Sequence, residues 1–296
     1  MNFRYTLSVL VIFALSLFQG CGPGGLQEGE IIGTVTEVDP GSLTIRISPQ
    51  NGEGNQNLLF SISNGDAAWL SEGREIRGIE LQKEGKTHLG NIFPHSHKEQ
   101  SLVFSKNHLL RRETDDRGEN VYREIGEEIP DFALFDQDGN IITRDSFWGR
   151  ATVVNFIFTR CKVAEMCPAA TMRMGKLLEA VKENSLDRVR LLSITMDPAF
   201  DSPGMLKAYA QGYKVDDPQY RFLSGSFQAV HDLKLQLGVD SNPDEEIIIS
   251  HSMRTILVGP DLKISHQVPG SQWDVEDFLK KIQGSFQPPS SPDANP

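Results

Sequence analysis

The chain has 296 residues, of which 39% are hydrophobic and 23% charged, and its formal net charge is -11. Those proportions are ordinary for a globular protein and exclude wholesale disorder. The length is enough for more than one hydrophobic core, so more than one domain is expected. Because an acidic surface repels phosphate backbones, nucleic acid is excluded as a partner bound through its backbone.

The first residues have the pattern of an export signal. Arg4 precedes an almost uninterrupted apolar run from Thr6 to Phe18, and Gly20 and Cys21 follow before a stretch rich in glycine and proline. This run is short for a membrane-spanning helix, which needs about 20 residues, but it fits the apolar part of a signal peptide. A cysteine directly after a small residue also resembles the lipobox of bacterial lipoproteins.

We therefore expect residues 1–20 to be a lipoprotein signal peptide, Cys21 to be lipidated, and residues 21–30 to link the anchor to the first domain. The protein would be exported and held on a membrane by its lipid, facing the periplasm or the cell exterior. The alternative is an ordinary cleaved signal peptide that leaves Cys21 as a free thiol. If Cys21 carries lipid, the mature protein keeps the pair Cys161 and Cys167, which in an oxidising compartment is a disulfide, a redox couple or a soft-metal site.

Residues 31–105 have the pattern of short strands separated by turns. Ile32–Val38 and Ser42–Ser48 alternate apolar and polar residues, with a turn signal around Pro40 between them. Further runs with strand character are Leu58–Ile62, Glu75–Leu81, Thr87–Phe93 and Ser101–Phe104. Together they predict a small all-β domain, and we expect an OB-like barrel.

Two segments lack apolar periodicity. Residues 106–128 carry many charges and are expected to be a charged linker that could hold a short helix. Residues 285–296 end in a stretch rich in proline and serine, which predicts a disordered tail.

Residues 129–284 alternate strands and helices. Ala151–Phe158 is a continuous apolar run rich in β-branched residues, as in a buried central strand, and Thr171–Asn184 has helical spacing. The elements that follow are a strand at Val189–Thr195, helices at Pro203–Tyr213 and Phe227–Leu237, a strand at Ser252–Val258 with a hairpin partner at Lys263–Gln267, and a helix at Val275–Ile282. This order predicts an α/β fold of the thioredoxin-like class, in which helices flank a central mixed sheet.

Cys161 and Cys167 lie where the first buried strand of this domain meets its first long helix. Unpaired N–H groups and the dipole at a helix N-terminus lower thiol pKa values, which favours reactive or metal-binding thiolates. Residues six apart on a regular helix diverge by about 240°, so both cysteines cannot lie on the helix and meet. We expect Cys161 in the loop, Cys167 in the first turn beside Pro168, and the residues between them bulging outward. The structural alternative is a stabilising disulfide or two inert buried cysteines.

Several stretches across residues 129–283 resemble the SCO/SenC family, and they occur in the same order as in that family. They are Pro130–Gly139, Phe156–Cys161, Cys167-Pro168, Ser193–Pro198, Asp201–Pro203, Ser250–Ser252 and Gly259–Lys263. The resemblance implies a thioredoxin-like fold and one copper ion, Cu(I) or Cu(II), held by Cys161, Cys167 and His251. Soft thiolates suit Cu(I), and an imidazole also permits Cu(II).

The resemblance also implies one of two roles. The first is a copper chaperone that loads the copper centre of cytochrome c oxidase, with the copper-bearing oxidase subunit or another periplasmic copper or thiol protein as its partner. The second is a thiol–disulfide oxidoreductase acting on partner-protein cysteines, in which Cys161 attacks and Cys167 resolves. A third hypothesis, a copper-responsive binding module acting through the N-terminal barrel, has no motif to support it.

The sequence departs from the family pattern near its expected ligands. The family spaces its cysteines as Cys-x-x-x-Cys, whereas the loop here is two residues longer and Lys162 directly follows the first cysteine. Ser250 replaces the aspartate that precedes the histidine in the family. A longer loop could loosen a metal site or tune the pair toward redox work. For His251 the alternative is a histidine that is only hydrogen-bonded.

Other polar residues have simpler interpretations. His95 and His97 have a spacing that could bind a divalent metal, but without a third ligand they are expected in a polar loop. His231 lies among apolar residues of a helix, which indicates packing. Asp197 is expected in a loop after the second strand, near the active face, as part of a turn or as a catalytic carboxylate.

Overall fold

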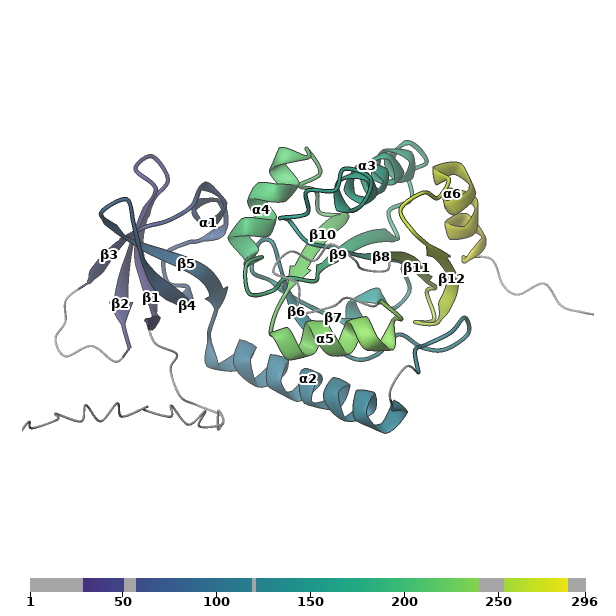
Figure 1. The fold of residues 1–296 in the computed structure, drawn as a ribbon, viewed down its shortest axis with the longest axis horizontal. Helices are drawn as coiled ribbons and strands as arrows, with labels where there is room; N and C mark the ends of the chain where they lie inside the picture. The colour runs from purple at the N-terminus through teal and green to yellow at the C-terminus, as the bar shows by residue number, and fades with distance from the viewer. Residues whose placement is uncertain (1–28, 51–56, 119–120, 240–252, 287–296) are drawn as a thin grey trace, which may run out of the picture.

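The computed structural model describes residues 29–50, 57–118, 121–239 and 253–286. Their buried apolar side chains form two separate clusters, one in the N-terminal third of the chain and one in the remainder. Figure 1 shows the two corresponding units, a small barrel and a larger α/β unit, joined by a long helix. Cys21 and His251 lie outside the described residues.

The N-terminal strands close into a barrel in the order β1-β2-β3-β5-β4. All pairs are antiparallel except β3 with β5, which is parallel. Alternate residues point inward, so that Ile45, Ile47 and Leu89 are buried in the barrel core. The bounds are β1 Glu30–Asp39, β2 Thr44–Pro49, β3 Leu58–Ser61, β4 Glu75–Lys83 and β5 Lys86–Pro94. This closed five-stranded barrel has the OB-like shape expected from the sequence.

A short helix, α1 (Asn64–Trp69), connects β3 to β4. It begins after Ser63, whose hydroxyl oxygen accepts a hydrogen bond of 3.0 Å from the Asp66 backbone N–H. The Asp66 carboxyl group is buried against the rest of the molecule, and this burial raises its pKa to about 6. The helix thus carries a buried acidic group on the side of the barrel that faces the α/β unit.

A long helix, α2 (His97–Arg117), joins the two units, and here the sequence-based predictions are wrong. Ser101–Phe104 is helical rather than a strand, and the expected linker 106–128 is helical as far as Arg117. The helix begins at a capping box formed by Ser96 and Glu99. Its buried residues are few, so it lacks the wide apolar stripe by which most surface helices are recognised.

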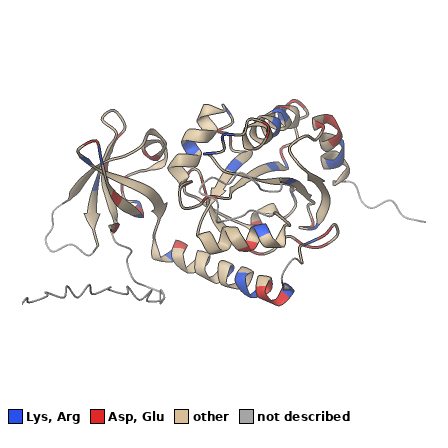
Figure 2. Cartoon of the chain, viewed as in Figure 1, with Lys and Arg blue, Asp and Glu red and all other residues tan. Residues whose placement is uncertain are grey.

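Polar contacts hold α2 against the α/β unit. The Asn107 side chain makes two hydrogen bonds of 2.9 Å, donating to the carbonyl of Ala133 and accepting from its N–H. The Nζ atom of Lys106 lies 2.9 Å from both Asp131 and Asp145. Figure 2 shows positive and negative residues close together along this helix. These contacts explain how a charge-rich segment forms a docked helix.

The rest of the described chain forms a seven-stranded mixed sheet in the order β12-β11-β8-β9-β10-β6-β7. The central strands β8, β9 and β10 are parallel, and the outer strands pair antiparallel. Every residue of β8 is buried, as its continuous apolar run predicts. The bounds are β6 Ala133–Asp136, β7 Ile141–Thr143, β8 Ala151–Ile157, β9 Val189–Thr195, β10 Tyr220–Ser224, β11 Arg254–Val258 and β12 Ile264–Pro269. The sequence pattern does not predict β6, β7 or β10, because each is too short to show a period.

Helices cover both faces of this sheet. In Figure 1, α3 and α6 lie together on one face, and α5 lies on the other beside α2. Met174, Leu177 and Val181 of α3 are fully buried, as the helical spacing predicts. The bounds are α3 Cys167–Glu183, α4 Pro203–Gly212, α5 Phe227–Gln236 and α6 Val275–Gly284, with a 3-10 turn, η1, at Arg144–Phe147. The architecture is thioredoxin-like.

Barrel and α/β unit touch directly. Helix α1 packs on α4, and Phe93 lies edge-on to Phe135 with ring centroids 6.1 Å apart. The guanidinium of Arg74 donates to the carbonyl of Gly139, in the hairpin between β6 and β7. The barrel is therefore docked on the sheet unit, close to the start of α4.

No helix in the described ranges combines the length and the apolar character needed to cross a membrane.

Candidate metal and thiol site

Cys161 and Cys167 flank the connection from β8 to α3. Cys161 lies in the loop, with its Sγ 3.8 Å from the carbonyl oxygen of Val163, and Cys167 is the first residue of α3. Pro168 stands in the first helical turn, and residues 162–165 between the cysteines are exposed. This arrangement agrees with the expected geometry, in which one cysteine lies in the loop and the other at the helix start. Both are free thiols.

The two thiols lie within interaction range of each other but differ in their environments. Cys167 is fully buried, and burial raises the pKa of its thiol well above the usual value. The charge and the hydrogen bond of Cys161 raise this pKa further, against the lowering effect of a hydrogen bond from the Phe158 backbone. For Cys167, desolvation therefore outweighs the helix N-terminus, which alone would favour the thiolate. The half-buried Cys161 is the more accessible of the two thiols.

A buried carboxylate supports the loop just before Cys161. The side chain of Asp201 accepts hydrogen bonds from the backbone N–H of Thr159 at 3.0 Å and from its hydroxyl group. Its Oδ2 also accepts from the hydroxyl of Thr195 at 2.5 Å, at the end of β9. Burial raises the pKa of Asp201 to about 6, despite the lowering effect of these hydrogen bonds. The strand end and the loop start are thereby tied to Asp201, which lies two residues before α4.

Arg160 forms a second contact with the loop after β9. Its Nε and Nη2 atoms lie 2.9 and 2.5 Å from the same carboxylate oxygen of Asp197. The guanidinium also stacks 4.4 Å from the ring centroid of Phe200. Asp197 therefore lies near the cysteines, as predicted, where it binds the residue that immediately precedes Cys161.

The far side of the cysteine loop is held by the segment after β12. The hydroxyl of Ser271 donates to the carbonyl of Glu165 at 2.7 Å. Arg173 of α3 in turn donates to the carbonyls of Ser271 and Trp273, both at 2.9 Å. The loop is thus fixed at both ends, although its middle is exposed.

The expected third ligand, His251, lies outside the described residues. Over the described ranges, no three histidine, cysteine, aspartate or glutamate side chains come together as a group that could hold a metal ion. Two soft thiol sulfurs that lie together can supply two ligands to Cu(I), and an imidazole could add a third donor. The two thiols therefore fit copper as part of a ligand set.

The other histidines have structural surroundings. His97 is the first residue of α2 rather than part of a loop, whereas His95 lies in the short connection between β5 and this helix, as expected. Burial lowers the pKa of His95, which favours the neutral ring. His231 of α5 stacks on Phe227 with ring centroids 6.0 Å apart, and its pKa is lowered by burial.

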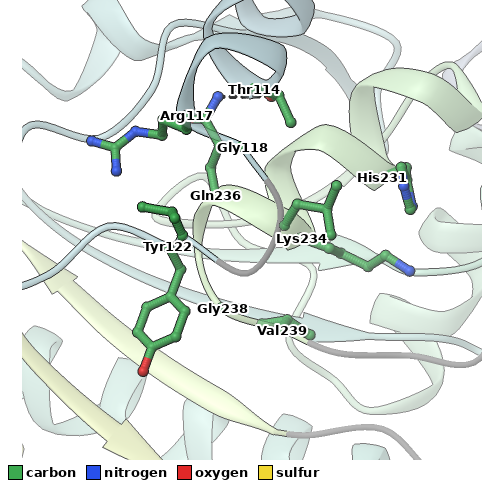
Figure 3. A pocket seen from close by; sticks show the side chains of 11 residues that line it. Thr114, Arg117, Gly118, Tyr122, His231, Lys234, Gln236, Gly238 and Val239 are labelled. Carbon is green, nitrogen blue, oxygen red and sulfur yellow. Dashed lines mark hydrogen bonds between the residues drawn. The ribbon is translucent and has the colours of Figure 1, made fainter.

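A cavity of about 480 Å³ lies between α2 and α5, away from the cysteines. Figure 3 shows Tyr122, His231 and Lys234 around it, together with Thr114 and Gln236. Its walls come from α2, from α5 and from the segments that follow these two helices, and they contain neither cysteine. Size alone therefore does not identify the site in this protein.

Sequence reasoning assigned no supporting role to the residues that hold the cysteine loop. Thr159, Asp201 and Ser271 carry no signal of reactivity, because each acts through a hydrogen bond to a residue distant in the chain. Asp201-Ser202-Pro203 has the composition of a helix start, which explains the start of α4 without revealing where the Asp201 side chain points.

The α/β unit has relatives among known proteins. A family model described as SCO1/SenC matches residues 122–287, more than half of the chain. This chain belongs to the SCO1/SenC family. The matched residues contain the whole seven-stranded sheet, both cysteines and His251, whereas the barrel lies outside the match.

Individual relatives support the same assignment. A SCO1 protein homolog of Bacillus subtilis is 31% identical over 172 residues, covering 57% of this chain and 88% of that protein. A protein of Stutzerimonas stutzeri named for copper binding is 31% identical over 137 residues, covering 45% of this chain and 65% of that protein. Among solved structures, a SCO1/SenC family lipoprotein from Bacillus anthracis has a TM-score of 0.50 and 25% identity, covering 56% of this chain and all of that one.

Proposed function

We propose that this protein is an exported copper-binding chaperone that binds one copper ion through Cys161, Cys167 and His251 and delivers it to the copper centre of cytochrome c oxidase. The observation that carries the proposal is the pair of adjacent thiols at the start of α3, one half-buried and one buried. The relative named for copper binding and the membership of the SCO1/SenC family support copper as the cargo.

Each residue has a distinct part in this proposal. Cys161 would meet the metal first, because its sulfur is the more exposed of the two. Cys167 would then lose its proton to the incoming metal, since a thiol with a raised pKa is deprotonated only when a cation replaces the proton. His251 would complete the set, and an open coordination position would let a partner take the ion.

Copper titration tests this proposal. The reduced chain carrying Cys21→Ser, in which only the pair remains, receives one equivalent of Cu(I) in competition with a chelator of known affinity. The Cys161→Ser and Cys167→Ser variants should each lose at least a hundredfold in affinity, and His251→Ala at least tenfold. Equal binding by the wild type and a Cys161→Ser/Cys167→Ser double variant would rule out the copper proposal. Equal binding by His251→Ala would remove only that ligand.

A second function is favoured by the asymmetry of the two thiols. A thiol–disulfide oxidoreductase needs one accessible and one protected cysteine, as Cys161 and Cys167 are. The Cys161 thiolate would attack a partner disulfide and release one partner thiolate. Cys167 would then attack the mixed disulfide, releasing the second partner thiolate and leaving a Cys161–Cys167 disulfide. The partner would gain two electrons, and the leaving thiolate would take the Cys167 proton.

Trapping separates the two functions. A Cys167→Ser variant of a reductase should accumulate a mixed disulfide with a model substrate such as oxidised glutathione, whereas the Cys161→Ser variant should not. A copper chaperone without reductase activity would bind Cu(I) but turn over a protein disulfide no faster than free dithiol.

We further propose a lipid anchor at Cys21, consistent with the structural neighbour described as a lipoprotein. The domains would then be a signal peptide at 1–20, an anchor linker at 21–30, a barrel domain from 31, a SCO1/SenC domain to 284 and a tail at 285–296. Labelling with radioactive palmitate should mark the wild type and leave Cys21→Ala unlabelled, and an unlabelled wild type would overturn the anchor.

A further inference from the structure

The barrel touches the α/β unit at the first turn of α4, where two glycines meet. A methyl group on Gly65 of α1 would lie 1.8 Å from the carbonyl oxygen of Gly204. Conversely, a methyl group on Gly204 would lie 2.0 Å from Oδ1 of Asp66. Real Cβ atoms essentially never come within 3.0 Å of such neighbours, so any larger residue at either position forces the two helices apart. The backbone of α4 therefore rests directly on the barrel.

A short buried segment joins this contact to the cysteine loop. Asp201, Ser202 and Pro203 precede Gly204 and are all buried, and the proline ring fixes φ at the helix start. At the other end of the segment, the Asp201 carboxylate accepts two hydrogen bonds from Thr159. Because this segment is short and buried, a displacement of the first turn of α4 would also displace Asp201 and, through it, the start of the cysteine loop.

The residue that Asp201 holds lies close to Cys161 in the sequence. Thr159 stands two residues before Cys161, and Arg160 between them is bound to Asp197 on the same connection between β9 and α4. Residues 162–165, beyond Cys161, are exposed. The contacts nearest to Cys161 in sequence are thus those on the β8 side, while Ser271 holds the far end of the loop through Glu165.

We propose that Asp201 is a positioning residue for Cys161 and that the barrel holds Asp201 in place by packing α1 on α4. The inference rests on the proposed function in one respect, namely that the cysteine pair is the working site. In this proposal the barrel helps to set the geometry of the cysteine pair and does not itself bind a ligand.

The measurable consequence is a change in the equilibrium between the dithiol and the disulfide. In the reaction with glutathione disulfide, the two protein thiols lose two protons and two electrons and form one S–S bond, while two glutathione thiols are released. The equilibrium constant depends on how well the two sulfurs are held in bonding geometry. If Cys161 is held less firmly, the disulfide forms less favourably and the reduction potential rises.

The experiment measures this constant in glutathione buffers on the full chain with Cys21→Ser. Asp201→Ala should lower the constant about tenfold, which corresponds to about 30 mV. Asp201→Asn keeps one acceptor oxygen and should give an intermediate value. Gly204→Ala, which leaves every residue of the site intact, should lower the constant at least threefold through the barrel contact.

Two glycine variants serve as controls. Gly212→Ala changes the same helix at its other end, where a methyl group meets nothing within 4 Å, and should leave the constant unchanged. Gly85→Ala strains a barrel turn with φ +75° away from α4, so it lowers stability without touching the contact. A constant in Gly204→Ala equal to that in both controls would overturn the role of the barrel. An equilibrium constant for Asp201→Ala equal to that of the wild type would overturn the role of Asp201.

Should Gly204→Ala fail to fold, the double variant Asp66→Ala/Gly204→Ala replaces it, because loss of the carboxylate removes the two shortest contacts while the added methyl group still lies 2.8 Å from the Asp66 backbone nitrogen. Its constant is compared with that of Asp66→Ala by the same threefold criterion. The readout needs no copper, so a wild type that fails to bind Cu(I) rules out the chaperone proposal and leaves this inference to be decided by the redox constants.

Discussion

Cys161 is half-buried and Cys167 is fully buried, although the two thiols interact with each other. The difference follows from their positions, since one lies in an exposed loop and the other in the first turn of a helix whose inner face enters the core. The pair is therefore asymmetric before any metal or partner arrives.

This asymmetry predicts selective alkylation. In the reduced Cys21→Ser background, iodoacetamide should modify Cys161 at least tenfold faster than Cys167, because alkylation requires an accessible thiolate. Mass spectrometry of Cys161→Ser and Cys167→Ser gives the two rates separately. Unfolding in urea is the control and should bring them together. Equal rates in the folded variants would contradict the described burial of Cys167.

A second prediction concerns pH and the buried Asp66. Its folded-state pKa of about 6 lies above the unfolded value of 3.8, so between these pH values the folded state binds more protons. The contribution of Asp66 to stability is thus largest at low pH and falls as pH rises through 6. Asp66→Asn should remove up to about 3 kcal/mol of that fall. Burial also raises the pKa of Asp201, so part of the decrease in stability with rising pH should remain in the Asp66→Asn variant.

Urea unfolding at pH 4 and pH 7.5 checks this prediction through an optical signal of the barrel. Asp66→Asn should be more stable than the wild type at pH 7.5 and differ from it by less than about 1 kcal/mol at pH 4. An equal difference at both pH values would show that the carboxyl group does not titrate in this range.

The polar docking of α2 gives a third prediction. Asn107→Ala removes both hydrogen bonds to Ala133 and leaves two backbone groups without their partner, which should cost about 2 kcal/mol in the free energy of unfolding. Ser105→Ala is the matched control, since its exposed hydroxyl bonds only to Leu102 of the same helix, and its effect should stay within about 0.5 kcal/mol. Comparable effects of the two changes would mean that α2 is not held by Asn107.

A fourth prediction compares two hairpin glycines. Gly139 and Gly85 have φ of +69° and +75°, so alanine strains both turns by about 1–2 kcal/mol. Only at Gly139 would the added methyl group meet Trp69 and Arg74 of the barrel, at 2.6 and 2.8 Å. Gly139→Ala should therefore cost at least about 1 kcal/mol more than Gly85→Ala. Thermal denaturation of both variants measures the difference, and equal losses would argue against the contact between barrel and hairpin.

Much of the α/β unit could be predicted from the sequence because its elements carry strong local signals. The continuous apolar run of β8 predicts a buried parallel strand. The spacing of Met174, Leu177 and Val181 predicts a helix with one buried face. The strand alternation of the barrel also follows from one buried face. These are one-dimensional patterns, so the printed sequence contains them.

Local patterns failed where an element depends on contacts with distant residues. Helix α2 has few buried residues and is held by Asn107 and Lys106 through partners that lie 25 or more positions away. Its sequence therefore resembles a linker. The short strands β6, β7 and β10 exist because neighbouring strands supply their hydrogen bonds, not because their own residues show a period.

The cysteine site, too, was predictable from the sequence only in part. Sequence alone determined which residues carry soft sulfur chemistry. It also predicted Cys161 in a loop and Cys167 at a helix start, because residues six apart on one regular helix cannot meet. Only the tertiary structure decided that burial, rather than the helix dipole, governs Cys167. It also decided that Asp201 supports the loop and that a glycine contact links it to the barrel, since desolvation and packing depend on segments that fold together from distant parts of the chain.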